Sequence, residues 1–262
     1  MTKLKFSKAT DQAKLRHVES WLGYKPNIYS FSLPSGYTCP FALDCLSKAD
    51  KISGKISDSK NTLYRCFSAS DESRYPSVRK QRWHNFDLLK HLETEVMYYL
   101  IKNSLPVKMD ICRIHVGGDF FNQKYFDAWV LIARNHPHIK FYAYTKSIPY
   151  WVHRLDKGFL SGIPSNLILN ASRGSRYDNL IDEYDLKVAE VVFSIEEATA
   201  KNLPIDHNEY YALNNYGNFA LLLHGTQPKN SQASEALKQL RKNNIQSGYN
   251  RSDVVYSSEL IK

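Results

Sequence analysis

Short apolar segments alternate with stretches of helical periodicity along most of the chain, and this alternation constrains the fold more than any other feature. Six segments have the length and residue types of strands, at residues 27–33, 110–120, 140–146, 166–172, 188–194 and 219–225. Helices are predicted at 9–21, 76–104, 124–135, 149–155, 196–202 and 231–242. Strands that alternate with helices form a parallel sheet with helices outside it. We therefore predict an α/β fold, a partial or closed (β/α) TIM-like barrel of about six parallel strands, with a doubly wound open sheet as the alternative.

Length and composition indicate one folded domain over residues 1–262. Hydrophobic residues make up 43% of the chain and aromatic residues 13%, which is enough apolar material for one sizeable core. The first residues carry charge but no apolar leader, and no run reaches the ~18 apolar residues that span a bilayer. We expect a cytoplasmic protein with no membrane partner. Four cysteines are too few for a disulfide scaffold, which favours metal or thiol roles.

Three of the four cysteines lie in one stretch, residues 34–70, between the first strand and the first long helix. Five residues separate Cys39 from Cys45, and twenty separate Cys45 from Cys66. The intervening residues are rich in Lys, Ser and Asp, so we expect something other than a hydrophobic core to hold them. Thiolates select iron–sulfur clusters, zinc or copper(I). The spacing alone leaves two interpretations open, a metal site formed by these cysteines and three unconnected thiols.

In either architecture the ligand site lies at the carboxyl ends of the strands. The candidates for binding a cofactor at these ends are Gly117, Gly118, Asp119, Lys146, Asn170 and Ser172. The two glycines would allow a ligand to approach the backbone closely. Any one of these residues could equally be a helix cap or a solvated loop residue, and Ser194 with Glu197 fits a capping box. Their coincidence at one end of the sheet favours a site.

Side-chain alternation divides the second strand into two faces. Cys112 shares its parity with Ile114 and Val116, so we expect it to face the helices as a structural thiol. Arg113 and His115 have the other parity and are expected to face the barrel interior. A cluster held by three cysteines leaves one iron free. His115 is a possible fourth ligand, because imidazole suits iron.

The formal net charge of the chain is +9. Basic surfaces attract nucleic acid and other polyanions. The basic residues are scattered, however, with no block longer than Arg79-Lys80 plus Arg82 or Arg241-Lys242, which is typical of a solvated basic surface. A nucleic-acid partner is therefore a secondary interpretation.

The order of strand, three-cysteine loop, helix and a strand ending in Gly-Gly-acid resembles the radical S-adenosylmethionine (radical SAM) enzymes. The resemblance implies a [4Fe-4S] cluster held by Cys39, Cys45 and Cys66. It also implies that residues 117–119, Gly-Gly-Asp here, stand where those enzymes carry the GGE motif that contacts the methionine amino group. S-adenosylmethionine is then a possible second cofactor. The cysteine spacing differs from the C-x3-C-x2-C that is usual in that class.

A closer likeness is to the phage gene product 88 family, whose members carry a TCP…C…C-aromatic segment, an R-x-H-x-x-GDF strand end and an aromatic-rich YTKS strand. The corresponding segments are residues 38–40 with Cys45 and residues 66–67, RIHVGGDF at 113–120, and YTKS at 144–147. The resemblance covers roughly residues 30–225, with an insertion between the second and third cysteines. It implies a viral protein made in the cytoplasm of an infected bacterial host, and no particular reaction.

Three functions are consistent with these features. The first is an iron–sulfur ([4Fe-4S]) cluster-binding protein of phage origin with a radical-SAM-like barrel and an unknown reaction, which in its enzymatic form would cleave S-adenosylmethionine. The second is a non-catalytic iron–sulfur protein that serves as a redox relay or binding module for an unidentified small-molecule or redox partner. The third is a zinc-containing nucleic-acid-handling protein, which the net charge suggests.

Overall fold

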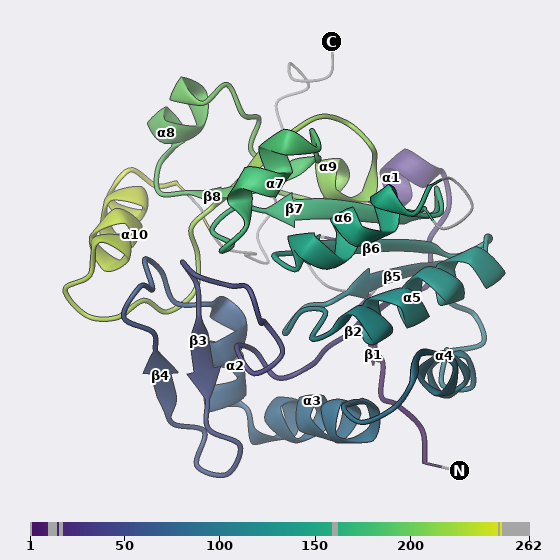
Figure 1. The fold of residues 1–262 in the computed structure, drawn as a ribbon. Coiled ribbons are helices and arrows are strands. Elements are labelled where there is room, and N and C mark those ends of the chain that lie inside the picture. Colours follow the sequence, from purple (N-terminus) through teal and green to yellow (C-terminus); the bar gives the residue numbers. More distant parts are fainter. Residues whose placement is uncertain (1, 10–14, 16–17, 159–161, 246, 248–262) are drawn as a thin grey trace.

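A seven-stranded, mostly parallel sheet forms the centre of the protein (Figure 1). The computed structural model describes residues 2–9, 15, 18–158, 162–245 and 247. The strands follow each other in the sheet in the order β1 (Ser7–Lys8), β2 (Ile28–Phe31), β5 (Ile111–Ile114), β6 (Lys140–Thr145), β7 (Leu167–Ser172), β8 (Val188–Val192) and β9 (Phe219–Leu222). The short β1 is antiparallel to β2, and every other neighbouring pair is parallel.

The sheet confirms the predicted α/β class and the six parallel strands. From β2 to β9 the strand order follows the sequence without the reversal that defines a doubly wound sheet. Closure into a complete barrel is not seen in the described part of the chain, because β1 and β9 are the two ends of the strand order and are not paired with each other. The ladder of strands is therefore open.

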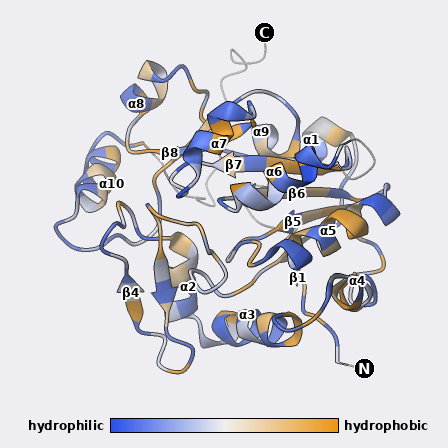
Figure 2. Cartoon of the chain, viewed as in Figure 1, coloured by the Kyte–Doolittle hydropathy of each residue, from blue (hydrophilic) through white to orange (hydrophobic). Residues whose placement is uncertain are grey.

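One face of the sheet is covered by α4 (Thr94–Lys102), α5 (Gln123–Asn135), α6 (Ile148–Asp156) and α7 (Asp178–Glu183) (Figure 1). Helices α4 and α5 carry both hydrophobic and hydrophilic residues (Figure 2), as expected for helices with one buried side. The core beneath them contains Trp129, Phe141 and Cys112, each with no exposed surface. The predicted position of Cys112 as a buried thiol on the helix side is confirmed.

The opposite face of the sheet packs against α1 (Val18–Leu22) and α9 (Tyr210–Leu213). A second core lies there, built around the side chains of Tyr142 and Phe219. A third core joins β8 and β9 to α8 (Ile195–Ala200) and α10 (Gln232–Lys242). The predicted cap of α8 is confirmed, because the hydroxyl of Ser194 accepts a hydrogen bond from the amide of Glu197 at 3.1 Å.

The prediction of one continuous helix over residues 76–104 is wrong. These residues form two helices, α3 (Pro76–Leu89) and α4, with a turn between them. The buried side chains of α3 include two arginines and an asparagine, whereas those of α4 are Met97 and Ile101. The turn allows α4 to pack beside α5. Most of the helix predicted at 9–21 lies outside the described residues.

The insertion between the second and third cysteines forms a hairpin that the sequence did not predict. Strand β3 (Ser47–Ala49) pairs with β4 (Ile56–Asp58), and α2 (Phe67–Arg74) follows. The Arg79 guanidinium of α3 donates hydrogen bonds to the carbonyls of Lys51 and Ile52 in the hairpin turn. Backbone pairing and this buried arginine hold the hairpin, as expected of a polar segment that something other than a hydrophobic core must order.

No helix in the described residues is long and apolar enough to cross a membrane.

Replacing Trp129 by Ala tests the core between α5 and the sheet. Its ring lies 5.5 Å from that of Phe31 and 6.1 Å from that of Phe141, between centroids. The cavity left behind should lower the free energy of unfolding by about 3–5 kcal/mol, measured by urea denaturation. Val107→Ala, at a fully exposed position, is the control and should leave stability nearly unchanged. An equal effect of both substitutions would contradict the packing described here.

Candidate functional site

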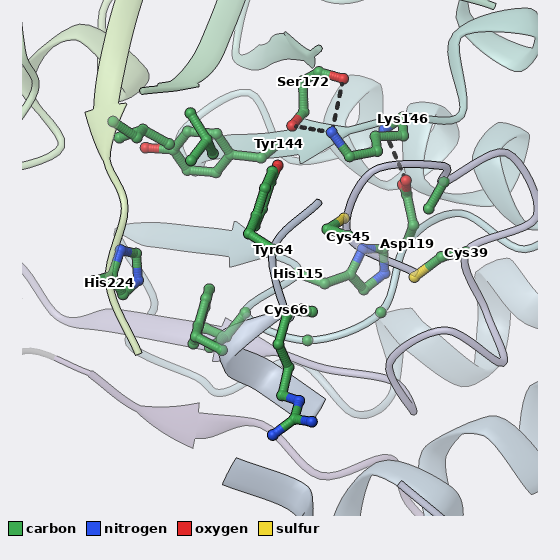
Figure 3. Close-up of a pocket in the computed structure, with 18 of the residues that line it drawn as sticks. Cys39, Cys45, Tyr64, Cys66, His115, Asp119, Tyr144, Lys146, Ser172 and His224 are labelled. Carbon is green, nitrogen blue, oxygen red and sulfur yellow. Dashed lines mark hydrogen bonds between the residues drawn. The ribbon is translucent and has the colours of Figure 1, made fainter. Parts of the chain in front are cut away.

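A cavity of about 160 Å³ lies at the carboxyl ends of the parallel strands. Cys39, Cys45 and Cys66 all line it, and each is partly exposed. Strands β5 to β9 or the residues that follow them provide the rest of the wall, together with Tyr64 and Phe67 of the cysteine segment. The structure therefore brings the three predicted cysteines to one cavity at the predicted end of the sheet (Figure 3).

Cys39 is held by a tight turn that follows β2. The Thr38 amide and hydroxyl both donate to the Pro34 carbonyl, at 3.2 and 2.8 Å. Gly36 has a φ of +73°, and a Cβ there would lie 2.4 Å from the Ser47 carbonyl oxygen, so no other residue fits. The Gly36 amide donates to the Cys39 sulfur at 3.3 Å.

Cys45 is anchored from the opposite side of the cavity. The amides of Leu43 and Asp44 donate to the Gly174 carbonyl, just beyond β7, at 2.9 and 3.2 Å. The Tyr64 amide donates to the Asp44 carbonyl at 3.2 Å, and its hydroxyl lowers the pKa of the Cys45 thiol against a larger effect of burial. The loop therefore reaches across from β2 to the end of β7.

Cys66 is the residue that precedes α2. The amides of Ser68 and Ala69 in the first turn of α2 lower the pKa of its thiol, against a larger effect of burial. The Cys66 side chain does not cap the helix, and the Ala69 amide donates to the Cys66 carbonyl at 3.1 Å. The Cys66 amide donates to the hydroxyl of Ser47, at the start of β3, at 3.4 Å. Of the three sulfurs, that of Cys39 accepts a hydrogen bond from the Gly36 amide, whereas Tyr64 and the first turn of α2 lower the pKa of the Cys45 and Cys66 thiols.

Burial raises the pKa of all three cavity thiols. The pKa of Cys39 is well above its usual range, with further increases from the nearby Asp119 and Cys66. That of Cys45 is raised by burial and lowered in part by the Lys146 ammonium, and that of Cys66 is raised to about 12. The thiols are therefore neutral at pH 7, and a bound cation would be needed to hold them together as thiolates.

A buried ion pair joins the two ends of the cysteine segment. The Glu72 carboxylate of α2 accepts from the amide of Ser35 at 2.9 Å and from Nη1 of Arg82 at 2.7 Å. The side chains of Glu72 and Arg82 are 0% and 5% exposed. Arg82 also donates to the carbonyl and hydroxyl of Ser68, and that hydroxyl accepts from the hydroxyl of Ser35 at 2.7 Å. This network sets the distance between the Cys39 turn and the helix that follows Cys66.

Gly117 and Gly118 line the cavity, but the protein itself occupies the space beside them. A Cβ on Gly117 would meet the Ser68 hydroxyl at 2.2 Å and the Arg82 guanidinium at 2.6 Å. Gly118 has a φ of +82°, and a Cβ there would meet the Thr38 hydroxyl at 2.5 Å and Leu33 at 2.8 Å. These glycines are needed so that β5 can approach the cysteine segment closely.

Asp119 is buried at the cavity wall with both carboxylate oxygens engaged. They accept from the Phe120 amide at 2.7 Å, the Thr145 hydroxyl at 2.6 Å and the Lys146 amide at 2.8 Å. Burial raises the pKa of Asp119 to about 6, and these three hydrogen bonds oppose the increase. Asp119 therefore ties the end of β5 to the end of β6.

Lys146 and Ser172 also line the cavity and contact each other (Figure 3). The Lys146 ammonium donates to the Ser172 hydroxyl at 2.9 Å and to the Arg173 carbonyl. Asn170 is buried and does not belong to the cavity wall. Its amide nitrogen donates to the carbonyls of Ala143 and Ala212, so it links β6 to α9 below the cavity.

His115 borders the cavity, but its ring packs on the helix side of β5. Its centroid lies 5.1 Å from that of Phe120 and 5.7 Å from that of Tyr125, whose hydroxyl is 2.8 Å from Nε2. Strand β5 ends at Ile114, so the alternation that predicted an inward ring no longer holds at this position. Burial, with a smaller effect of the Arg113 charge, lowers the pKa of His115 to about 3.

Several cavity residues were not among the predicted site residues. Arg113 faces the cavity, as its parity predicts, and donates to Glu209 at 2.9 Å. The Arg113 guanidinium carbon also lies 4.9 Å from the ring centre of Tyr144. Tyr64 and His224 complete the wall (Figure 3). Only tertiary structure brings Glu209 to Arg113, because the two are 96 residues apart.

The grouping of these side chains bears on the kind of metal site. In the described part of the chain, no three His, Cys, Asp or Glu side chains converge closely enough to hold a single ion. An iron–sulfur cluster separates its ligand sulfurs more widely, because each binds a different iron atom. The chemistry of the donor set fits a cluster, since three thiols line one cavity and a backbone amide donates to one of them.

The fold and the cavity define an α/β protein with an open, mostly parallel sheet and a cysteine-lined cavity at the strand ends. The family model for Gene product 88 matches residues 2–242, so the chain belongs to that phage protein family. The Gene 88 proteins of Mycobacterium phages L5 and D29 are each 27% identical over 128 residues, which is 45% of this chain and 47% of theirs. The chain therefore spans about half the length of these relatives. No solved structure gives a significant match.

Substitution of Arg82 tests the network that joins the cysteine turn to α2. Arg82→Met leaves the Glu72 carboxylate buried without its cation, and this should lower the free energy of unfolding by about 3–5 kcal/mol in urea denaturation. The double variant Arg82→Met with Glu72→Leu removes both charges and should recover much of that loss. Lys124→Ala, which breaks a solvent-exposed pair with Glu93, is the control and should change little. If Arg82→Met were as stable as the wild type, Arg82 would not be the partner that neutralises the buried Glu72 carboxylate.

The buried His115 predicts a loss of stability in mild acid for the protein prepared without metal. Its pKa is about 3 in the folded state, against an ordinary value of 6.5, so the unfolded chain binds a proton that the folded chain does not. The contribution of neutral His115 to the free energy of unfolding is complete above pH 6.5. Below pH 6.5 this contribution declines by about 1.4 kcal/mol for each pH unit. Urea denaturation at pH 7 and pH 5 should show this decline in the wild type and a smaller one in His115→Gln. An equal decline in the free energy of unfolding in the wild type and in His115→Gln would show that His115 does not cause it.

Proposed function

We propose that this protein binds a [4Fe-4S] cluster through Cys39, Cys45 and Cys66. The observation that carries the proposal is that the three sulfurs line one cavity at the carboxyl ends of the strands, where the Gly36 amide donates a hydrogen bond to the Cys39 sulfur. Hydrogen bonds to cluster-ligand sulfurs are one of the means by which proteins set the reduction potential of such clusters. A bound cluster would supply one-electron redox chemistry at the carboxyl ends of the strands.

The surrounding residues would serve this centre in distinct ways. The Gly36 amide, the Tyr64 hydroxyl and the amides at the start of α2 would stabilise negative charge on the thiolates. The Glu72–Arg82 pair would hold two of the ligands at a constant separation. Asp119 and Lys146 would line the adjacent space, where S-adenosylmethionine or another small molecule would bind beside the cluster.

A partial barrel of the radical-SAM kind is our proposal for the shape of this fold. It is supported by the sequential strand order, and by the position of the cysteine segment between β2 and β5 and of Gly-Gly-Asp between β5 and α5. The alternative is a non-catalytic iron–sulfur protein that acts as a redox relay or binding module. The Asp119 carboxylate favours this alternative in one respect, because both of its oxygens already accept hydrogen bonds within the protein.

Anaerobic reconstitution with iron and sulfide tests the cluster. The wild-type chain should bind both and give a brown protein with a broad visible absorption band. Cys39→Ser, Cys45→Ser and Cys66→Ser should each lower the iron content markedly. Cys112→Ser is the matched control, because this thiol is buried in the helix-side core and should not affect iron binding. A colourless wild-type protein, or an equal loss of iron in Cys112→Ser, would reject the proposal.

Electron paramagnetic resonance of the reduced protein separates the catalytic version from the relay version. A signal that changes on addition of S-adenosylmethionine would support binding of that molecule at the cluster. An unchanged signal with reversible reduction would leave the redox or binding role and exclude the enzymatic one.

A further inference from the structure

A row of aromatic rings and lysines lies on one side of α3 and the adjoining β3–β4 hairpin. On α3, Lys80, Trp83, Asp87 and Lys90 follow each other at three- and four-residue steps, which places them on one side of the helix. The hairpin brings Lys51 to the same side. Its ammonium lies 4.6 Å from the centre of the Trp83 ring and 2.7 Å from the Asp87 carboxylate. These contacts join the hairpin to α3, and the two elements lie next to each other in the fold (Figure 1).

Further rings extend the row in both directions from Trp83. The Tyr37 ring lies 4.8 Å from that of Trp83, and the Phe86 ring lies 5.9 Å from it, between centroids. The Lys48 ammonium is 5.1 Å from the centre of the Tyr37 ring, and that of Lys90 is 6.0 Å from the centre of the Phe86 ring. We call the rings of Tyr37, Trp83 and Phe86, with Lys48, Lys51 and Lys90, the aromatic–lysine row.

The row is accessible and its charge is positive. Tyr37 is 39% exposed, and Trp83 and Phe86 are partly exposed. Within the row, the Asp87 carboxylate pairs with two lysine ammonium groups, Lys51 and Lys90, so one positive charge is in excess at that point. Lys48 and Lys80 add further positive charge. The neighbouring Asp50 carboxylate accepts hydrogen bonds from the amide and hydroxyl of Ser53 in its own turn.

Alternating rings and cations suit single-stranded nucleic acid better than other anionic partners. Every base has a flat face that stacks on an aromatic ring, and each nucleotide carries one phosphate that a lysine can contact. An acidic protein segment would use the lysines but would gain little from three neighbouring rings. Double-stranded DNA keeps its bases stacked inside the duplex, where these rings cannot reach them.

We propose that the aromatic–lysine row binds single-stranded nucleic acid, with bases against Tyr37 and Trp83 and phosphates against Lys48 and Lys51. The row uses none of the cysteines, so this proposal does not require the cluster; Tyr37 belongs to the turn that precedes Cys39, and the other members belong to α3, its C-cap and the hairpin.

Fluorescence anisotropy with a labelled single strand of about 16 nucleotides, a length within the known site sizes, tests the proposal. DNA and RNA strands of the same sequence form two arms, and binding of either supports it. Affinity should fall with rising salt, and heparin at equal charge should compete less well than the unlabelled strand. Absence of binding at low salt, or heparin competing as well as the strand, would overturn the proposal, the latter because it indicates a general polyanion surface.

Single-residue variants test whether the nucleic acid binds at the aromatic–lysine row. Tyr37→Ala should weaken binding at least about fivefold, the loss of one stacked base. Lys51→Gln should reduce the slope of log affinity against log salt by about 0.7, the loss of one phosphate contact on a single strand. Tyr99→Ala and Lys102→Gln on α4 are the matched controls, because Tyr99 is 59% exposed and Lys102 lies 5.8 Å from the centre of the Tyr98 ring. Equal effects in the row and in the controls would overturn the proposal, provided that thermal unfolding shows all four variants folded.

Discussion

The buried carboxylate of Glu72 is the interaction on which the cavity depends. It accepts hydrogen bonds from Ser35, in the turn before Cys39, and from Arg82, on the helix behind α2. Buried ion pairs contribute little net stability compared with apolar packing, but a buried charge without its partner is costly, so such pairs permit few alternative arrangements. This one fixes where α2 begins relative to the end of β2. It thereby holds Cys39 and Cys66 on the same cavity although a hairpin is inserted between them.

The same network explains the two glycines that follow β5, Gly117 and Gly118. Ser68 and Arg82 lie where a side chain on Gly117 would be, and Thr38 and Leu33 lie where one on Gly118 would be. Sequence reasoning assigned these glycines to ligand approach, because a Gly-Gly turn at a strand end permits it. In the folded protein they permit the approach of the cysteine segment itself. The consequence for function is indirect: β5 forms the wall against which the thiols are assembled.

Much of the fold could be predicted from local pattern. The six parallel strands, α5 and the Ser194 cap follow from periodicity and from short-range hydrogen bonding, and Cys112 was placed correctly because strand alternation holds within β5. Alternation failed one residue beyond the strand, at His115, whose ring packs against Tyr125 and Phe120. The break between α3 and α4 was missed because the two helices bury different kinds of side chain, and apolar spacing does not reveal buried arginines.

The sequence by itself determined the order of strands and helices, the end of the sheet at which a site would form, and the three cysteines that line it. These depend on periodicity and on the geometry of parallel sheets, which are local or general. Only the tertiary structure decided that the sheet stays open, that Glu72 bonds to both Ser35 and Arg82, and that Glu209 faces Arg113. Those features depend on contacts between residues far apart in the chain. These contacts become favourable only when the packed elements exclude water, so no local sequence pattern predicts them.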